Sequence, residues 1–305
     1  MFVWLERSYE MKAIGIMTDS HSGISKEEAA RFGIRVLPMP FSIDGESYYE
    51  DVTISRPEFF ERMRSGAEVA TSQPSPEAVL MMWDEMLQEF EQVLYLPLSS
   101  GLSGSCMTAA AMARDEKYEG RIFVVDNGRI SVPLHQSLRD TWELVQTGKY
   151  DAEEIRKILE DTKENMSIYI ALDTLEYLKK GGRINPAAAA VASVLNIKPV
   201  MMLSTGKLDI YQKCRGSRKA RHVMIEAMKN DLSTRFREAC EAGEVQLMAA
   251  SSSTPEVTAE WVAQIQEAFP GMDVLCDDLS IGVSCHVGPG GLGIGCSCKP
   301  VIKQL

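Results

Sequence analysis

Short apolar runs alternate with helix-forming stretches along the first half of this 305-residue chain. Four runs lie between turn signals and are typical of buried strands, at residues 13–18, 34–41, 92–98 and 121–126. Stretches with helical patterns accompany them, starting near Ser25 and at residues 57–64, 76–90, 104–117 and 134–147. This alternation predicts an α/β fold in which the first half forms a mostly parallel, doubly wound sheet.

The pattern changes after Tyr150. An amphipathic helix is expected over residues 151–166, followed by a strand at 167–172. Two apolar runs, 198–203 and 207–214, flank Ser204, Thr205 and Gly206, which predicts a β-hairpin. Further strands are expected at 245–250, 272–276 and 283–287. The chain length favours two domains, which we place at 11–160 and 161–305, the second with a mixed or antiparallel sheet and helices.

Charge and cysteine content restrict the class of protein. Charged residues make up 25% and hydrophobic residues 45%, as in soluble globular proteins. The net charge of −11 argues against a general nucleic-acid binder, because such a surface repels phosphates. An odd count of seven cysteines is typical of reduced thiols, so we expect a cytoplasmic protein. The N-terminus lacks the pattern of a secretory signal.

Three loops at expected strand ends are rich in hydroxyl side chains, at residues 18–22, 71–75 and 99–105. Ligands of open α/β sheets bind beyond the carboxyl ends of the strands. We expect the backbone N–H groups of residues 101–105 to point out of a helix N-terminus, beside a hydroxyl, as a site for a carboxylate or phosphate. Helix capping alone is the simpler alternative for any single loop.

A glycine-rich loop follows His286 near the end of the chain. Gly288, Gly290 and Gly293 match G-x-G-x-x-G, but too few residues follow them for the helix of a dinucleotide-binding unit. We instead expect the backbone to pass close to a ligand, with His286 beside it. The alternative is a buried, structural histidine whose hydrogen bonds are made with the backbone alone.

Three positive charges lie within a few residues, on Lys179, Lys180 and Arg183. A helix that ends at Gly181 explains why Lys179 and Lys180 are basic, because positive charges are favourable in the last turn of a helix. It leaves Arg183 without a role. Asn185 and Pro186 then start an alanine-rich helix, which either packs on the sheet or lines a narrow apolar tunnel. The sequence lacks a complete phosphate-binding P-loop, a G-x-S-x-G nucleophile elbow and the paired C-x₂-C of structural zinc sites, so we expect no metal and no cofactor.

Taken in order, six motifs resemble the DegV family of bacterial fatty-acid-binding proteins. They are Thr18-Asp19-Ser20, Thr71-Ser-Gln-Pro-Ser75, Ser99-Ser-Gly-Leu-Ser-Gly104, Tyr177-Leu-Lys-Lys-Gly-Gly-Arg-Ile184, Ile197-Lys-Pro199 and His286-x-Gly-Pro-Gly290. The resemblance implies a two-domain α/β protein that holds a long-chain fatty acid between its domains. It implies a carrier without catalytic residues, which presents the carboxylate to a separate, dihydroxyacetone-kinase-like fatty acid kinase subunit for acyl-phosphate formation and phospholipid synthesis.

The resemblance also implies the roles of particular residues. Thr71 and Ser103 bind the carboxylate, and His286 lies beside it. The supporting loop positions are Asp19, Ser20, Ser72, Ser100, Gly101 and Gly288. We expect Arg183 to help the kinase dock or to stabilise phosphoryl charge. A local basic patch around Lys179 would allow transient membrane contact.

The chain departs from the family pattern in two segments. Residues 127–135 stand where family members tend to have small, glycine-rich sequence, and Ser105-Cys106-Met107 replaces a threonine and an aromatic residue. These departures bear on the acyl chain length and the class of ligand that the protein prefers, more than on its fold. Two other functions stay open: a binding protein for another anionic small molecule, and a hydrolase that uses Ser103 or Ser100 with His286 and Asp19.

Overall fold

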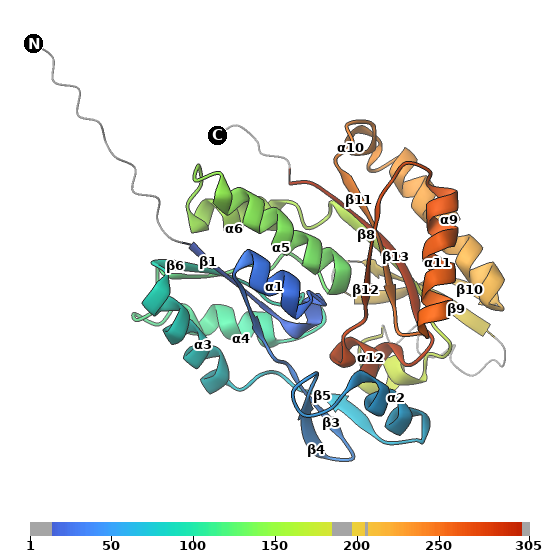
Figure 1. Cartoon of the computed structure of the whole chain (residues 1–305), viewed down its shortest axis with the longest axis horizontal. Coiled ribbons are helices and arrows are strands. Elements are labelled where there is room, and N and C mark those ends of the chain that lie inside the picture. The colour runs from blue at the N-terminus through green and yellow to red at the C-terminus, as the bar shows by residue number, and fades with distance from the viewer. Residues whose placement is uncertain (1–13, 185–196, 205–206, 301–305) are drawn as a thin grey trace, which may run out of the picture.

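The first half of the chain forms a parallel sheet with helices on both faces (Figure 1). The computed structural model describes residues 14–184, 197–204 and 207–300. The four strands lie in the order β2-β1-β6-β7 and are all parallel. Their bounds are β1 Ile14–Asp19, β2 Ile34–Leu37, β6 Gln92–Leu96 and β7 Ile122–Val124.

Alternate residues of the two central strands supply two separate cores. Ile16 and Leu94 pack with helices on one face, and Met17 and Val93 pack with helices on the other. The first face carries α1 Lys26–Phe32, α5 Ser131–Gln146 and α6 Ala152–Asp161. The second face carries α3 Pro76–Glu89 and α4 Ser105–Met112. The predicted doubly wound arrangement is therefore confirmed.

Side-chain caps explain where several helices begin. Ser25, Ser75 and Thr254 each accept a hydrogen bond from a backbone N–H in the first turn of the following helix. Asp151 forms a capping box with Glu154 at the start of α6. Each such cap stabilises its helix by about 1 kcal/mol. Local sequence was sufficient to predict the starts at Ser25, Ser75 and Asp151, whereas the helix after Thr254 was not predicted.

The second half forms a mixed six-stranded sheet in the order β10-β9-β8-β13-β11-β12. All pairings are antiparallel except that of β11 with β12, which confirms the prediction of a mixed or antiparallel sheet. The strands are β8 Met166–Ala171, β9 Ile197–Ser204, β10 Lys207–Arg215, β11 Val245–Ser251, β12 Val274–Asp278 and β13 Leu292–Cys298. β9 and β10 pair antiparallel as predicted, and the tip of the turn between them lies outside the described residues.

Two helices cover one face of this sheet and enclose its core. These are α9 Ser217–Ser233 and α11 Pro255–Ala268, whose buried side chains include Met224 and Trp261. The remaining helices among the described residues of this half are α7 Glu176–Gly181, α10 Arg237–Glu241 and α12 Ile281–Val287. Because α9 and α11 occupy one face, the other face is left to meet the first half of the chain (Figure 1).

A third, small antiparallel sheet was not predicted. It has the order β4-β3-β5, with β3 Pro40–Ile43, β4 Glu46–Tyr49 and β5 Val69–Thr71, and α2 Arg56–Arg64 packs against it. The single strand predicted at 34–41 is thus two strands, because Pro38 has no N–H with which to continue the β2 ladder. β3 leaves the parallel sheet and starts the small sheet.

The strand predicted at 283–287 is wrong, because this segment belongs to helix α12. Ser280 caps the helix by accepting a hydrogen bond from the Val283 N–H, and burial of Ile281 and Cys285 against Phe59 fixes it in place. Ile281 and Cys285 lie one helical turn apart, and their burial favours a helix over the predicted strand. The helix predicted at 104–117 ends at Met112, and the strand predicted at 272–276 lies at β12.

Helix α5 lies between the two larger sheets (Figure 1). Its His135 Nδ1 is 2.6 Å from Asp277 Oδ2 of β12. Just before it, Arg129 donates to Ser297 Oγ of β13 over 2.6 Å. Polar contacts from α5 and from the loop before it therefore join the two halves. The division into domains near residue 160 stays a prediction, and no helix in the described ranges is long and apolar enough to cross a membrane.

Candidate functional site

A cavity of about 330 Å³ lies between α5, the loops of the first sheet and the open face of the second sheet. This volume is at the small end of the range for small-molecule sites. Most of the wall is apolar and comes from the second half, including Ile168, Ile170, Leu203 and Met248. The polar side chains of the wall come from several separate loops and helices, and they are His21, Thr71, Ser72, Gln73, Ser103, Ser131, Arg183 and His286.

A hydrogen bond in the wall joins Thr71 to His286. Thr71 Oγ1 lies 2.8 Å from His286 Nε2, although 215 residues separate them in the chain. Thr71 ends β5 of the small sheet, and His286 lies in the last turn of α12. The packing of α12 against the small sheet therefore creates this pair.

Burial keeps the His286 imidazole neutral. Burial, with a smaller effect of the nearby Arg183 guanidinium, lowers the pKa of His286 to about 4. The Nδ1 atom has no hydrogen-bond partner among the described residues. We therefore assign the single proton to Nε2, from which it is donated to Thr71 Oγ1. The hydroxyl hydrogen of Thr71 is then free to be donated to a ligand oxygen.

Ser103 contributes a second hydroxyl from the loop before α4. Its Oγ lies 3.1 Å from Ser105 Oγ and accepts a hydrogen bond from the Ser105 N–H over 3.2 Å. Ser103 lines the same cavity as Thr71. Thr71 ends β5 of the small sheet, whereas Ser103 lies in the loop between β6 of the parallel sheet and α4.

Of the five backbone N–H groups expected to be free at residues 101–105, four are used within the loop, and that of Gly104, which lines the cavity, is the exception among the described residues. The Gly101 N–H donates to Ser99 Oγ, and the Leu102 and Ser103 N–H groups donate to Ser99 O. The Ser105 N–H donates to Ser103 Oγ. Ser99 is buried and organises the loop from within, so hydroxyl groups, rather than this set of amides, face a ligand.

Ser72 lines the cavity, whereas five predicted supporting positions lie behind its wall. Asp19 is fully buried and accepts hydrogen bonds from the N–H groups of Leu98 and His21. Ser20 Oγ accepts from the Met39 N–H over 3.1 Å. These contacts hold the loops that carry His21, Leu98 and Met39, which themselves line the cavity.

Three further supporting residues fix loop shape. Ser100 Oγ donates to Asp126 over 2.7 Å, and Gly101 bonds to Ser99 as described above. Gly288 has a φ of 78°, and a Cβ atom there would lie 2.3 Å from the Tyr177 ring. Its carbonyl accepts from Ser252 Oγ over 2.7 Å. Glycine at 288 is thus required by backbone conformation and by close packing at the end of α12.

Arg183 lies at the edge of the cavity and is partly buried. Its Nε donates to Leu102 O over 3.3 Å, and its Nη1 donates to Gly181 O. Helix α7 ends at Gly181, and Gly182, rather than Gly181, is the left-handed cap. The exposed Lys180 pairs with Glu176 over 2.7 Å. The helix predicted from Asn185 lies outside the described residues.

Some wall residues were not predicted as site residues. His21 is buried in the wall, next to Gly282 of α12. Gly293 and Gly295 of β13 also line the cavity. Two glycines at alternate positions of an apolar strand were the signal that could have identified them, because such glycines mark close approach of another group.

The geometry does not form a Ser–His–Asp triad. His286 Nε2 contacts Thr71, and Ser103 Oγ contacts Ser105 instead of a histidine. Asp19 bonds to Leu98 and His21 rather than to His286. No group of three or more His, Cys, Asp or Glu side chains with metal-binding geometry occurs among residues 14–184, 197–204 and 207–300. The arrangement suits an amphiphile with one polar, oxygen-bearing end and an apolar body.

Comparisons with known proteins agree with this geometry. The sequence model described as "Uncharacterised protein, DegV family" matches residues 13–299. A DegV domain-containing protein of Caldanaerobacter subterraneus is 29% identical over 93% of this chain and 98% of its own. A second, of Deinococcus radiodurans, is 29% identical over 92% of this chain and 97% of its own.

Solved structures show the same fold. A DegV family protein from Thermus thermophilus, whose structure is described as showing fatty acid binding, has a TM-score of 0.83 at 28% identity, covering 94% of this chain and 99% of that one. DegV of Bacillus subtilis, described as a fatty acid binding protein, also has a TM-score of 0.83, at 24% identity, over 94% of this chain and 100% of that one. At this lower identity the likeness supports the fold alone.

Proposed function

Because the chain belongs to the DegV family, we propose that it binds a long-chain fatty acid in the cavity between its two halves. The carboxylate lies against Thr71, Ser103 and His286, and the hydrocarbon chain occupies the apolar part. The fatty acid bound by the Thermus relative supports this ligand class. The observation that carries the proposal is the hydrogen-bonded Thr71–His286 pair at one side of an otherwise apolar cavity.

Elementary energetics favour such a ligand. Each buried methylene contributes about 0.8 kcal/mol, so the apolar wall supplies most of the affinity. A buried carboxylate needs hydrogen-bond donors, and the hydroxyls of Thr71 and Ser103 supply them without an ion pair. A neutral His286 does not neutralise the carboxylate, so a carboxylate oxygen keeps the electron density with which it can attack a phosphoryl group.

We further propose that the protein is a non-catalytic carrier that works with a fatty acid kinase subunit. Bound acid is presented to the kinase, which forms the acyl phosphate for phospholipid synthesis. Arg183, at the edge of the cavity, contacts the kinase or the transferred phosphoryl group. The carrier needs no cofactor, acts in the cytoplasm and makes only transient membrane contact.

Mass spectrometry of an organic extract from the natively purified protein tests ligand binding. We expect one fatty acid per protein molecule in the wild type, and a reduced amount in the Thr71→Ala/Ser103→Ala variant. Ser65→Ala is the control, because Ser65 is exposed just after α2 and lies outside the cavity wall. An extract that stays empty after incubation with tetradecanoic, hexadecanoic and octadecanoic acids would overturn the proposal and favour another anionic ligand.

Kinase-dependent phosphorylation of the bound acid tests the role of Arg183. We expect Arg183→Ala to retain the acid and to slow acyl-phosphate formation at least tenfold, as removal of a charge-stabilising donor does elsewhere. Lys180→Ala is the control, since Lys180 is exposed and pairs with Glu176. Equal rates for Arg183→Ala and wild type would exclude this role.

A further inference from the structure

The central strand β13 carries glycine at two alternate positions on one face. Leu292 and Cys296 lie in the core beneath α9 and α11, whereas Gly293 and Gly295 line the cavity. Glycine within a strand destabilises it by about 0.5–1 kcal/mol relative to alanine. Glycine in such a place commonly marks close approach of a ligand or of another backbone. The two glycines therefore leave a groove on the sheet face that meets the cavity.

The strand register orders the two glycines by depth. Gly293 pairs with Ile170 and Ala250, and Gly295 pairs with Ile168 and Met248. Gly291, just before the strand, packs against Val287 of α12, the neighbour of His286. Gly293 is therefore nearer the carboxylate site, and Gly295 lies about 7 Å farther along the strand.

The first turn of α5 lies opposite the deeper glycine. A Cβ atom at Gly295 would be 3.9 Å from Pro133 Cγ, an ordinary van der Waals contact. Pro133 itself lines the cavity. The proline ring is rigid and stands at the buried start of a long helix, so this part of the wall cannot easily yield.

We propose that Gly293, Gly295 and Pro133 determine which acyl chain lengths the protein accepts. The hydrocarbon chain lies along the glycine face of β13, passes Gly293 first and Gly295 second, and ends at Pro133. This inference rests on the proposed fatty acid binding and specifies how the ligand lies. Side chains introduced at the two glycines then shorten the groove at two different depths.

The surroundings of Gly293 make it well suited to substitution. A Cβ atom there would lie 3.6 Å from both Ala250 O and Tyr169 O, which is ordinary contact. Gly293→Ala therefore fits the sheet and places its methyl group in the groove. At Gly295 the nearest atom would be Ser167 O at 3.0 Å, so this neighbour must shift slightly. Both variants are checked for a cooperative thermal transition before binding is measured.

The experiment measures dissociation constants for saturated straight-chain acids of increasing length, from octanoic to octadecanoic acid. For wild type we expect affinity to rise about fourfold per methylene, the equivalent of about 0.8 kcal/mol, until the chain reaches Pro133. The increase stops at a shorter acid in Gly295→Ala, and at a still shorter acid in Gly293→Ala and Gly293→Val. Pro133→Ala extends the series to a longer acid.

Cys298→Ala is the matched control, because Cys298 belongs to β13 but lies in the core beneath α9 and α11. It lowers stability and leaves the length at which affinity stops rising unchanged. If folded variants at Gly293, Gly295 and Pro133 all keep the wild-type limit, or if the order of the two glycines is reversed, the inference is wrong while fatty acid binding stands. If the wild type binds none of the acids, the proposed function itself fails.

Discussion

At the scale of single residues, the hydroxyl of Thr71 and the imidazole of His286 act as one unit. With the proton assigned to Nε2, the His286 imidazole donates to Thr71 Oγ1 over 2.8 Å, and the Thr71 hydroxyl hydrogen stays available for another acceptor. A carboxylate that accepts this hydrogen is stabilised by the stronger class of hydrogen bond, one with a charged partner. Neither side chain alone provides this arrangement.

Replacement of Thr71 by valine removes the hydroxyl and keeps the shape of the side chain. We expect the dissociation constant for hexadecanoic acid to rise about tenfold to a hundredfold, because a hydrogen bond to a charged group contributes about 1.5–3 kcal/mol. Isothermal titration calorimetry measures the change. Thr234→Val, at the exposed end of α9, should bind as wild type does. Equal affinities for the Thr71 and Thr234 variants would contradict this role of Thr71.

The low pKa of His286, about 4 against 6.5, gives a testable dependence of stability on pH. The folded protein takes up this proton less readily than the unfolded chain does. The contribution of neutral His286 to the free energy of unfolding is therefore complete above pH 6.5, and it is lost as pH falls towards 4. The loss amounts to about 3 kcal/mol. Urea unfolding of wild type and of His286→Gln from pH 7 to pH 4 should show this loss in the wild type only, and parallel curves would refute it.

At the scale of elements, the small sheet and α12 dock through a carboxylate and an arginine. Glu50 Oε2 accepts a hydrogen bond from the Ile281 N–H, at the first residue of α12, over 2.8 Å. Arg56 donates to Leu279 O and Ser251 O, and its Nη1 lies 3.8 Å from Glu50. This docking is what brings Thr71 of β5 to His286 of α12.

Burial raises the pKa of Glu50 to about 6, against an ordinary value of 4.5. The folded protein therefore holds this proton more tightly than the unfolded chain does. The resulting stability is present below pH 4.5 and is lost as pH rises through about 6. When pH rises from 4.5 to 7, we expect the free energy of unfolding of Glu50→Gln to increase by up to about 2 kcal/mol relative to that of wild type.

Urea unfolding at these two pH values measures the difference between Glu50→Gln and wild type. Glu61→Gln, an exposed position on the neighbouring α2, is the control and should not change the pH dependence. A difference between Glu50→Gln and wild type that is independent of pH would show that the Glu50 carboxyl titrates as an exposed group does.

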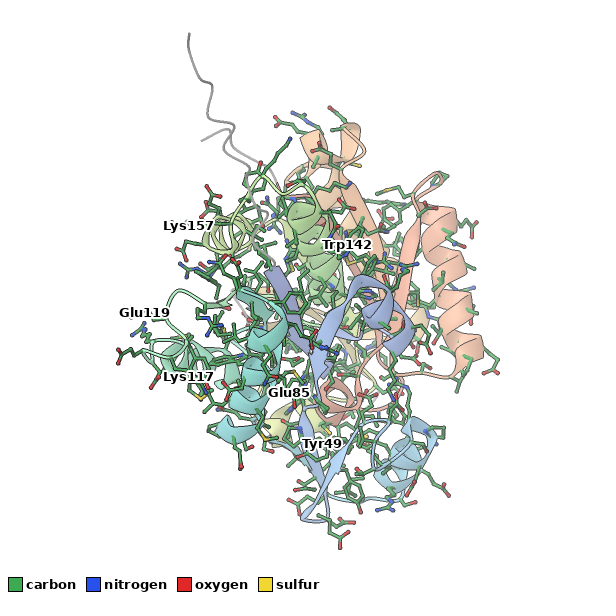
Figure 2. All side chains as sticks on the ribbon, turned by 60° about the vertical axis from the view of Figure 1, so that its left-hand side comes forward. Tyr49, Glu85, Lys117, Glu119, Trp142 and Lys157 are labelled. Carbon is green, nitrogen blue, oxygen red and sulfur yellow. The ribbon has the colours of Figure 1, made fainter. Side chains whose placement is uncertain are left out.

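At the scale of the whole molecule, α5 and the loop before it hold the two halves together around the cavity. Arg129 is fully buried and donates to Ser137 Oγ, Ser297 Oγ and Thr162 O. The outer surface is highly charged by comparison, and Lys117, Glu119 and Lys157 point into solvent in Figure 2. Among the described residues, Arg129 shares the interior with the buried carboxylates Asp19, Asp140 and Asp231.

Loss of the buried guanidinium should weaken the whole fold. We expect Arg129→Ala to lower the free energy of unfolding by at least about 3 kcal/mol, because its three acceptors lose their donor and a cavity forms. Chemical denaturation followed by circular dichroism measures the change. Arg114→Ala, at an exposed position, should change stability by less than about 0.5 kcal/mol. A similarly small loss for Arg129→Ala would show that this contact does not hold the halves together.

Local sequence determined most secondary structure and much of what was expected of the site. The strands β1, β6 and β8 follow from short apolar runs, and α3 and α6 follow from their caps, because these signals act within a few residues. The hydroxyl-rich loops and the glycine-rich end of the chain indicated an anion site before any contact was known. Thr71, Ser103 and His286 do line one cavity.

Tertiary structure alone decided how these parts meet. The small sheet forms because β3 pairs with β5 across a long connection, and α12 is helical where alternation suggested a strand. The amides near Gly101 are used by Ser99, and the depth of the groove follows from the register of β13. Such features depend on packing between segments far apart in the chain, where burial and hydrogen-bond satisfaction outweigh local preference.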